Sequence, residues 1–196
     1  MLAAIVLGGG RSARMGTDKL ALRLGGATLL DRTCAAAARV AGRVVVAGHE
    51  RPGLDVEFVL EDPPFGGPVA GIVAAAASLD IPARIASGGD SDWVVILAGD
   101  LANPRAVVDL LAAAEPGPDG VVLVDDEGWP QFLAGRYRLA ALRRALDAAG
   151  GARDTSVRRF FAGLDLARVP APPSVTADLD TPEEFAQARC LFYDTP

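Results

Sequence analysis

Apolar residues along this chain gather in short continuous runs, and longer segments with helical spacing lie between them. Continuous apolar runs of about four to eight residues, bounded by turn-forming residues, are typical of buried parallel strands. Apolar positions that recur about every three or four residues predict helices. The predicted strands are Leu2–Leu7, Arg43–Ala47, 57–60, 93–97, Gly120–Val124 and 131–135, and the predicted helices are 28–40, 68–79, 104–114, 139–149 and 155–162.

The alternation of strands and helices predicts an α/β fold with three layers. We expect a Rossmann-like arrangement, in which helices cover both faces of a mostly parallel sheet. Neither an internal repeat nor a linker-like stretch divides the sequence, so residues 1–196 are predicted to form a single domain. Ligands of such sheets bind beyond the carboxyl ends of the strands. The residues that directly follow the apolar runs are therefore the candidates for a binding site.

Three connecting segments have turn-forming or capping sequences. Residues 80–92 are rich in Gly, Ser, Pro and Asp and predict a loop. Residues 170–173 contain three prolines and predict a stiff connector. Thr181 is followed by Pro182 and, three residues after the threonine, by Glu184. This order is a capping box and predicts the start of a last helix.

Composition narrows the class of protein further. With 196 residues, of which 51% are hydrophobic and 22% charged, the chain suits a soluble globular protein with a sizeable core. The formal net charge of −6 argues against binding to duplex nucleic acid. Cys34 and Cys190 are far apart in the sequence and suit a reducing compartment, so a cytoplasmic location is expected. The apolar run 69–79 is too short to span a bilayer, and we expect neither a membrane segment nor a secretory signal.

One basic residue stands out. Of the 19 basic residues, 18 are arginine and only Lys19 is lysine. The high arginine content is typical of a coding bias that supplies arginine wherever a generic positive charge is needed. A lysine ammonium is a compact point charge and a guanidinium is a wide planar fork, so the two are not interchangeable at a tight phosphate site. Lys19 is therefore a candidate for a site that requires an ammonium group.

The sequence that leads to Lys19 is rich in glycine and positive charge. Gly8, Gly9 and Gly10 follow the first predicted strand, and Arg11, Arg14 and Lys19 come after them. Successive glycines allow the backbone to approach a ligand closely and to turn several N–H groups toward one point. This segment predicts a phosphate-binding loop.

Other interpretations of this loop remain open. It could be a flexible loop with solvated charges. Residues 8–13 also fit the dinucleotide pattern G-x-G-x-x-A, with Asp31 as a loosely placed ribose acid, although that pattern alone is weak. The Walker pattern is excluded, because Lys19 does not follow a glycine and precedes Leu20 instead of a serine or threonine.

The segment from Leu7 to Lys19, LGGGRSARMGTDK, closely resembles the signature of sugar-nucleotide-type nucleotidyltransferases. Among these it is most similar to the molybdenum cofactor guanylyltransferases. The resemblance implies a fold of the nucleotide-diphospho-sugar transferase type. It also implies transfer of GMP from GTP to molybdopterin, with release of pyrophosphate and dependence on Mg²⁺. The family's usual opening is Leu-Ala-Gly-Gly, so Gly8 is a small departure.

Further matches follow in the family's order. Asp100 lies where the family carries a metal-binding aspartate, although the proline that usually follows is displaced to Pro104. Gly67, Pro68 and the residues up to 71 resemble the family segment Gly-Pro-Leu-Ala-Gly. Asp62 lies where the family places an acid near the guanine base, and the adjacent Glu61 is an alternative for that role. A carboxylate suits guanine because N1–H and the N2 amino group are neighbouring donors.

Two later segments depart from the family pattern. Asp178 and Asp180 precede the capping box at positions where the family has asparagines. Carboxylates would bind metal more strongly than amides, and as an alternative they only stabilise the positive helix N-terminus. Residues 131–138 are similar to a family stretch that begins Gln-Pro, with Phe132 in place of the proline, and we expect this stretch to line the pterin side.

The resemblance implies specific roles for these residues. We expect Arg14, Lys19 and Asp100 to be catalytic and Asp100, Asp178 and Asp180 to hold metal. An already ionised acceptor phosphate needs no general base, so positioning and charge neutralisation carry the reaction. The partners implied are GTP, molybdopterin and, transiently, molybdoenzymes or their chaperones. The nucleotide-binding residues implied are Leu7, Gly8, Gly9, Gly10, Lys19, Asp62, Gly67, Pro68 and Asp100.

Three alternative functions stay open. The first is a cytidylyltransferase that acts on the same acceptor, which the two aspartates at 178 and 180 favour. Gly9 favours guanine instead, because cytidylyl relatives have alanine there and the missing Cβ leaves room for a larger base. The second alternative is a nicotinamide-dependent reductase based on the dinucleotide pattern. The third is a non-catalytic nucleotide sensor with the same fold.

Overall fold

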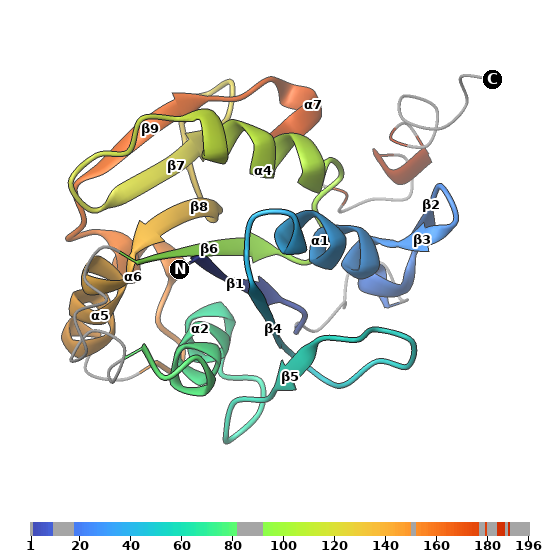
Figure 1. Ribbon diagram of the computed structural model, residues 1–196, viewed down its shortest axis with the longest axis horizontal. Coiled ribbons are helices and arrows are strands. Elements are labelled where there is room, and N and C mark those ends of the chain that lie inside the picture. Colours follow the sequence, from blue (N-terminus) through green and yellow to red (C-terminus); the bar gives the residue numbers. More distant parts are fainter. Residues whose placement is uncertain are drawn as a thin grey trace.

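The computed structural model describes residues 2–9, 18–81, 92–149, 152–176, 179, 184–186 and 188. Its centre is a seven-stranded sheet with the strand order β5-β4-β1-β6-β8-β7-β9 (Figure 1). A separate pair of two-residue strands, β2 and β3, forms a small hairpin. The strands are β1 (Leu2–Leu7), β2 (Arg23–Leu24), β3 (Ala27–Thr28), β4 (Arg43–Ala47), β5 (Glu57–Val59), β6 (Trp93–Ala98), β7 (Gly120–Val124), β8 (Pro130–Arg138) and β9 (Leu166–Pro170).

The sheet is mostly parallel, as the sequence predicts. β1 pairs in parallel with β4 and with β6, β4 pairs in parallel with β5, and β7 pairs in parallel with β9. β8 is antiparallel to both of its neighbours, β6 and β7. All the other strands of this sheet therefore end at one edge, and β8 begins there.

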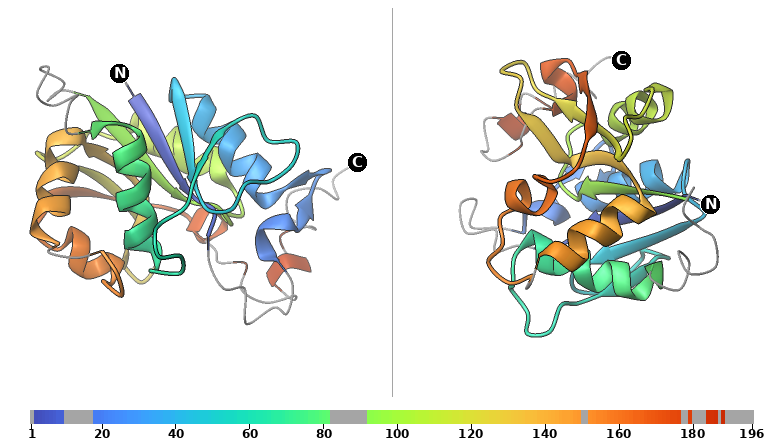
Figure 2. Two further views of the ribbon diagram at one scale, coloured as in Figure 1. Left: turned by 90° about the horizontal axis from the view of Figure 1, so that it is seen from below. Right: turned by 90° about the vertical axis from the view of Figure 1, so that its left-hand side faces the viewer.

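Helices cover both faces of the sheet, which confirms the three-layer prediction. Helices α1 and α4 lie on one face, and α2, α5 and α6 lie on the other (Figures 1 and 2). Successive residues of β1 alternate between the two cores: Ile5 packs in the core with α2, and Val6 packs in the core with α1 and α4. The helices are α1 (Leu29–Ala38), α2 (Pro68–Ser78), α4 (Pro104–Ala113), α5 (Leu139–Ala148), α6 (Val157–Phe161) and α7 (Pro173–Thr176), and a 3₁₀ helix, η1, spans Lys19–Ala21.

Local sequence explains where these helices begin. Thr28 caps α1 by accepting the backbone N–H of Asp31, and the Asp31 carboxylate accepts the N–H of Thr28 in return. Asn103 caps α4 through its side-chain oxygen. Pro68 and Pro104 each occupy the first helical position, where a backbone N–H would have no helical partner. These starts agree with the helices predicted at 28–40, 68–79 and 104–114.

Two strands of the main sheet differ from the prediction, and β2, β3, η1 and α7 were not predicted. β8 extends to Arg138, beyond the predicted end at 135, with Tyr137 fully buried between the half-buried Arg136 and Arg138. β9 covers residues for which the sequence predicts no element, apart from Pro170 at the start of the predicted connector. It pairs with β7 alone and ends at Pro170, and a proline is tolerated on an edge strand because no further ladder donor is needed there.

Some predicted segments lie outside the described residues. Most of the loop at 80–92 does so, as does the capping box at 181–184 apart from Glu184. Leu179, Phe185 and Ala188 pack with Leu24 and the start of α1 in a small third core beside the β2–β3 hairpin. In the part of the chain that the structure describes, no helix is long and apolar enough to cross a membrane.

The strand β8 contains a bulge at the edge of the sheet where the other strands end. Val122 of β7 pairs with Gly135, but the next residue, Leu123, pairs with Gln131. The intervening residues of β8 are displaced from the regular ladder, and bulges of this kind redirect side chains and occur often next to active sites. The hydroxyl of the fully buried Tyr137 donates to the carbonyl of Phe132 at 2.7 Å, which supplies a partner for a carbonyl within the bulge.

Candidate active site

Three glycine turns meet at the carboxyl edge of the sheet, after β1, β4 and β6. A Cβ on Gly48 would lie 2.5 Å from the carbonyl oxygen of Gly8, and one on Gly99 would lie 2.6 Å from the carbonyl oxygen of Leu7. A backbone hydrogen bond joins the same two turns, since the N–H of Gly99 donates to the carbonyl of Leu7 at 3.0 Å. No other residue type fits at 48 or 99 without displacing the backbone.

Gly8 and Gly9 have different roles in this arrangement. The N–H of Gly8 donates to the carbonyl of Ala47 at 2.9 Å. The amide of Gly8 thus continues the β1–β4 ladder. Gly8 instead allows close packing, because a Cβ there would lie 2.5 Å from Val46 Cγ1. Gly9 is exposed and has room for a Cβ, whose nearest neighbour would be the Ala47 carbonyl oxygen at 3.4 Å.

The structure brings two of the predicted catalytic residues into direct contact. Lys19 Nζ lies 2.7 Å from Asp100 Oδ2, with side chains that are 12% and 35% exposed. Lys19 begins η1, and Asp100 comes two residues after the end of β6. The ammonium is largely enclosed, and the carboxylate keeps access to solvent. Arg14 and Gly10, the other predicted members of this loop, lie outside the described residues.

An ion pair that the sequence did not predict holds the base of Lys19. Arg51, in the loop after β4, makes a two-pronged contact with the Asp18 carboxylate, with N–O distances of 2.6 and 3.0 Å. Asp18 also caps η1 by accepting the N–H of Leu20. The hydrogen bonds from Arg51 are the main reason that the pKa of Asp18 is below its ordinary value. Arg51 thereby ties the start of η1 to the end of β4.

A buried hydroxyl supports the turn on the other side. Thr33 of α1 is fully buried, and its Oγ1 donates to the carbonyl of Gly99 at 3.3 Å. This contact fixes the residue directly before Asp100. A helix on one face of the sheet thus orients the turn that carries the carboxylate.

The start of α2 forms a further wall of the site. Gly67 has φ +90°, a conformation that favours glycine, and precedes Pro68 at the first helical position. Gly71 packs against Ala47 and Leu7, at 3.1 and 3.4 Å from a Cβ built on it. The first turn of the helix therefore packs against the ends of β4 and β1.

The two candidate acids in the loop before α2, Glu61 and Asp62, differ in their contacts. The Glu61 Oε1 atom accepts the N–H of Phe65 at 3.0 Å. Asp62 is exposed. Because one oxygen of Glu61 is committed to the loop, Asp62 is the better candidate for contact with a base.

A cleft of about 350 Å³ opens beside Asp100. The bulge in β8 supplies one wall, so Asp100 and the predicted acceptor stretch that begins at Gln131 line the same space. The lining residues are Ala98, Asp100, Leu101, Pro130, Gln131, Phe132, Leu133, Ala134, Val157 and Val175.

Asp100 is the carboxylate of this site that suits a metal ion. Within the described ranges, no group of three or more His, Cys, Asp or Glu side chains could hold a metal. Mg²⁺ needs few protein ligands, since it keeps several waters and binds through one or two carboxylates and the phosphates of a substrate. The partly exposed carboxylate of Asp100 fits this requirement. Asp178 and Asp180, the other predicted ligands, lie outside the described residues.

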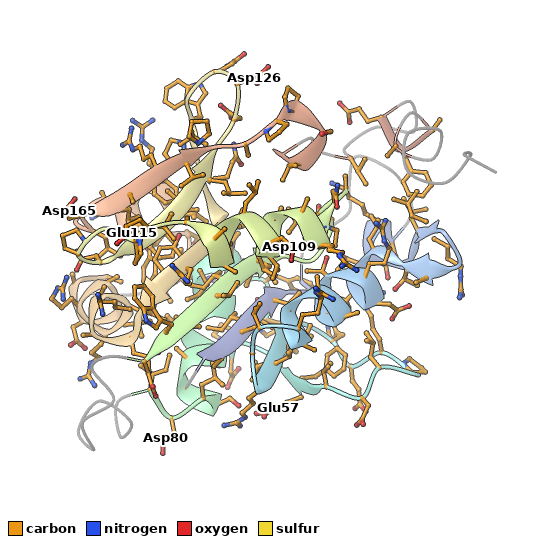
Figure 3. All side chains as sticks on the ribbon, turned by 45° about the horizontal axis from the view of Figure 1, so that its top comes forward. Glu57, Asp80, Asp109, Glu115, Asp126 and Asp165 are labelled. Carbon is orange, nitrogen blue, oxygen red and sulfur yellow. The ribbon has the colours of Figure 1, made fainter. Side chains whose placement is uncertain are left out.

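Acidic side chains elsewhere lie around the periphery of the molecule. Figure 3 shows Glu57, Asp80 and Asp165 at its outer margin and Asp126 at the tip of the hairpin that joins β7 to β8. The acidic residues that contribute to the net charge of −6 therefore include many outside the site.

The fold and the site together define a nucleotide-binding α/β enzyme, with glycine turns, a lysine and a carboxylate at the carboxyl edge of a mostly parallel sheet. Comparison with known proteins specifies the family. Residues 4–168 match the family of MobA-like NTP transferase domains. The chain belongs to this family and is a nucleotidyltransferase, which confirms the resemblance seen in the sequence.

Individual relatives agree with this assignment. The chain is 30% identical to the molybdenum cofactor guanylyltransferase of Rhodobacter capsulatus, over 96% of this chain and 95% of that protein. Molybdopterin-guanine dinucleotide biosynthesis protein A from Archaeoglobus fulgidus has the same fold, with a TM-score of 0.63 and 19% identity over 97% of this chain and 98% of the other. The 2-C-methyl-D-erythritol 4-phosphate cytidylyltransferase from Thermus thermophilus gives a TM-score of 0.58 and 22% identity, over 97% and 98% of the two chains. At these identities the two structures show the fold alone.

Proposed function

We propose that this enzyme transfers GMP from GTP to molybdopterin in a Mg²⁺-dependent reaction that releases pyrophosphate. The observation that carries the proposal is the contact between Lys19 and Asp100, 2.7 Å apart, where the glycine turns after β1, β4 and β6 meet. A cation and a carboxylate at this edge are what a triphosphate and its metal ion require. We propose that residues 1–196 act as one catalytic domain.

The reaction follows from charge and position. A phosphate oxygen of the acceptor forms a bond to the α-phosphorus of GTP, and the bond between the α-phosphorus and the bridging oxygen breaks as pyrophosphate leaves. Lys19 stabilises the negative charge on the phosphates, together with Arg14 and the amides of Gly9 and Gly10. Asp100 would hold Mg²⁺, with Asp178 and Asp180 as candidate further ligands. When bound, the ion would stabilise negative charge on the phosphate groups.

Recognition of guanine is assigned to the loop before α2. We propose that Asp62 accepts the N1–H and N2 amino donors of the base, near Gly67 and the open side of Gly9. The names of the relatives, molybdenum cofactor guanylyltransferases, support GTP over CTP. The likeness to a cytidylyltransferase structure concerns the fold alone and does not support CTP.

The acceptor is assigned to the cleft beside Asp100. Its apolar walls suit a ring system, and because Asp100 lines it, an acceptor phosphate bound there would lie next to the proposed nucleotide site. The names of the sequence relatives, molybdenum cofactor guanylyltransferases, support this choice of acceptor. We propose that the product is handed on to molybdoenzymes or their chaperones.

The direct test incubates the purified protein with Mg²⁺, molybdopterin and either GTP or CTP, and follows pyrophosphate. We expect release with GTP, at a rate at least tenfold above that with CTP. Preferential use of CTP would assign a cytidylyltransferase instead. Tight binding of GTP without turnover would indicate a nucleotide sensor, and a thermal shift with NADH but not with GTP would indicate a reductase.

A further inference from the structure

An exposed tryptophan and an arginine lie next to the cleft that contains Asp100. Trp129 is 53% exposed, and the guanidinium carbon of Arg158 lies 5.4 Å from the centre of its ring. The residues next to them in sequence, Pro130 and Val157, line the cleft. The β7–β8 hairpin and the helix α6 therefore each carry one member of the pair directly beside a residue that lines the cleft.

Asp125 fixes the conformation of the hairpin at this point. Its Oδ1 accepts the backbone N–H groups of Glu127 and Trp129, at 3.1 and 2.8 Å. Its Oδ2 accepts the side-chain amide of Gln131 at 2.7 Å. One carboxylate thus holds both Trp129 and Gln131. Because the amide nitrogen of Gln131 is bound to Asp125, its side-chain oxygen is the end that can accept a hydrogen bond within the cleft.

The interior of the cleft is apolar and built on aromatic packing. Phe132 lines it, and the ring of Phe132 stacks on that of Phe161, with centroids 5.5 Å apart. Leu133, Val157 and Val175 add aliphatic surface. Within the lining, polar side chains are confined to Asp100 and Gln131. An apolar space with a few placed polar groups is typical of a site for a flat organic ring.

We propose that Trp129, Gln131 and Arg158 bind the ring of the acceptor, a pterin, and thereby select it. The indole offers a face for stacking, the oxygen of Gln131 accepts ring N–H or amino donors, and Arg158 donates to the ring carbonyl. An exposed tryptophan on a hairpin held by hydrogen bonds is ready to stack without further ordering, which favours binding. This assignment rests on the proposed function for the identity of the acceptor.

Binding of a stable pterin tests the assignment without any turnover. The probe is pterin-6-carboxylate, followed by the anisotropy of its own fluorescence. We expect the wild-type protein to bind it, and Trp129→Ala and Arg158→Ala each to weaken binding about tenfold, as is typical of lost stacking and cation–π contacts. Trp129→Phe retains a ring and should bind within about threefold of wild type.

The chain offers matched controls for both positions. Arg159, next to Arg158, lines a different cleft between α5 and α6. Trp93, at the other end of β6, also contacts arginines, with Arg138 4.5 Å from its ring centre. Arg159→Ala and Trp93→Phe should bind the pterin as the wild type does. No binding of the probe by the wild type, or equal binding by Trp129→Ala, would overturn the assignment.

Kinetics separate this assignment from the proposed function. In Trp129→Ala we expect KM for molybdopterin to rise about tenfold while KM for GTP is unchanged. GMP transfer with an unaltered KM for molybdopterin would refute the role of Trp129 and leave the proposed function intact. Pterin binding that depends on Trp129 and Arg158, in a protein that transfers no nucleotide, would support the assignment and refute the proposed function.

Discussion

The three glycines at positions 9, 48 and 99 differ in how much room the structure leaves for a side chain. A Cβ would have ordinary contacts at Gly9, whereas at Gly48 and Gly99 it would meet backbone atoms at 2.5 and 2.6 Å. Gly9 therefore leaves space that a ligand can occupy, whereas Gly48 and Gly99 allow the neighbouring turns to pack closely. A methyl group added at each position separates these roles.

Gly9→Ala is expected to fold normally and to lower kcat/KM for GTP relative to CTP by about tenfold, the scale expected for one misplaced methyl group. Gly48→Ala is expected to lose about 1–3 kcal/mol of unfolding free energy, because the neighbouring backbone must move. Steady-state kinetics with both nucleotides and urea unfolding measure the two effects. An unchanged nucleotide preference in Gly9→Ala would remove this residue from base selection.

Lys19 and Asp100 are the residues on which the proposed reaction depends most. Lys19→Ala and Asp100→Ala should each reduce pyrophosphate release by about 10²–10³, as is typical for loss of one preorganised charge. Both variants should remain folded, since the pair lies at the edge of the sheet and in none of the three cores. Lys19→Arg tests the need for a compact ammonium and should also be impaired. Near-normal turnover in both alanine variants would contradict the mechanism.

At the scale of elements, the bulge in β8 decides where the acceptor cleft lies. The buried hydroxyl of Tyr137 binds the Phe132 carbonyl inside the bulge, and its ring stacks on Phe161 at 4.6 Å. Burial raises the pKa of Tyr137 well above its ordinary value, so the hydroxyl stays protonated and able to donate. One side chain thus links the bulge to α6, which carries Val157 and Arg158.

Tyr137→Phe should destabilise the protein by about 1–2 kcal/mol, since the partly buried carbonyl of Phe132 loses its donor while the ring remains. Tyr137→Leu, which loses the stacking as well, should cost more. Urea unfolding at neutral pH measures both. We also expect KM for the acceptor to rise in Tyr137→Phe while KM for GTP stays constant. An effect on GTP instead would mean that the bulge serves the nucleotide side.

The sequence was sufficient for elements with strong local signals and insufficient for contacts made by topology. The runs at β1, β4 and β6 are continuously apolar, and Thr28 and Pro68 mark helix starts, so these elements were predicted correctly. β9 was not predicted, because an edge strand needs no continuous apolar run and its pattern is half exposed.

The same division holds for the site. The placement of Lys19 and Asp100 in one site was predicted, because the apolar runs that precede them end at one edge of the sheet, but their direct contact was not. The support from Arg51 and Thr33 was not, since each pairs with a residue far away in sequence whose position only the packed structure fixes. The contact between Trp129 and Arg158 depends on the hairpin turning toward α6, for which the sequence has no local signal.

At the scale of the whole molecule, carboxylates with lowered pKa values make the free energy of unfolding depend on pH in the acidic range. The hydrogen bond from Ser78, followed by those from Arg43, lowers the pKa of Glu57, and Arg51 does the same for Asp18. A carboxylate whose pKa is lowered in the folded state stabilises the fold at pH values above its pKa in the unfolded chain. This stabilisation is lost as the pH falls through its pKa in the folded state. These groups join β4, β5, α2 and η1.

The melting temperature is therefore expected to be flat near neutral pH and to fall as pH drops below about 4.5. Ser78→Ala should reduce this acid dependence, because the pKa of Glu57 returns toward its ordinary value, and should lower the melting temperature at pH 7. Calorimetry from pH 7 to pH 3 measures both slopes. A steeper acid loss in Ser78→Ala than in wild type would contradict the assignment of Glu57.

The reversed direction of β8 has a consequence for engineering. Because β8 begins at the edge where its neighbours end, the β7–β8 hairpin reaches the active edge as a closed loop attached at both ends to neighbouring strands. The nucleotide is assigned to turns after β1, β4 and β6, in the other half of the sheet. The hairpin at 125–129 could therefore be exchanged as a cassette, so that the enzyme accepts a different acceptor while the turns assigned to the nucleotide are unchanged.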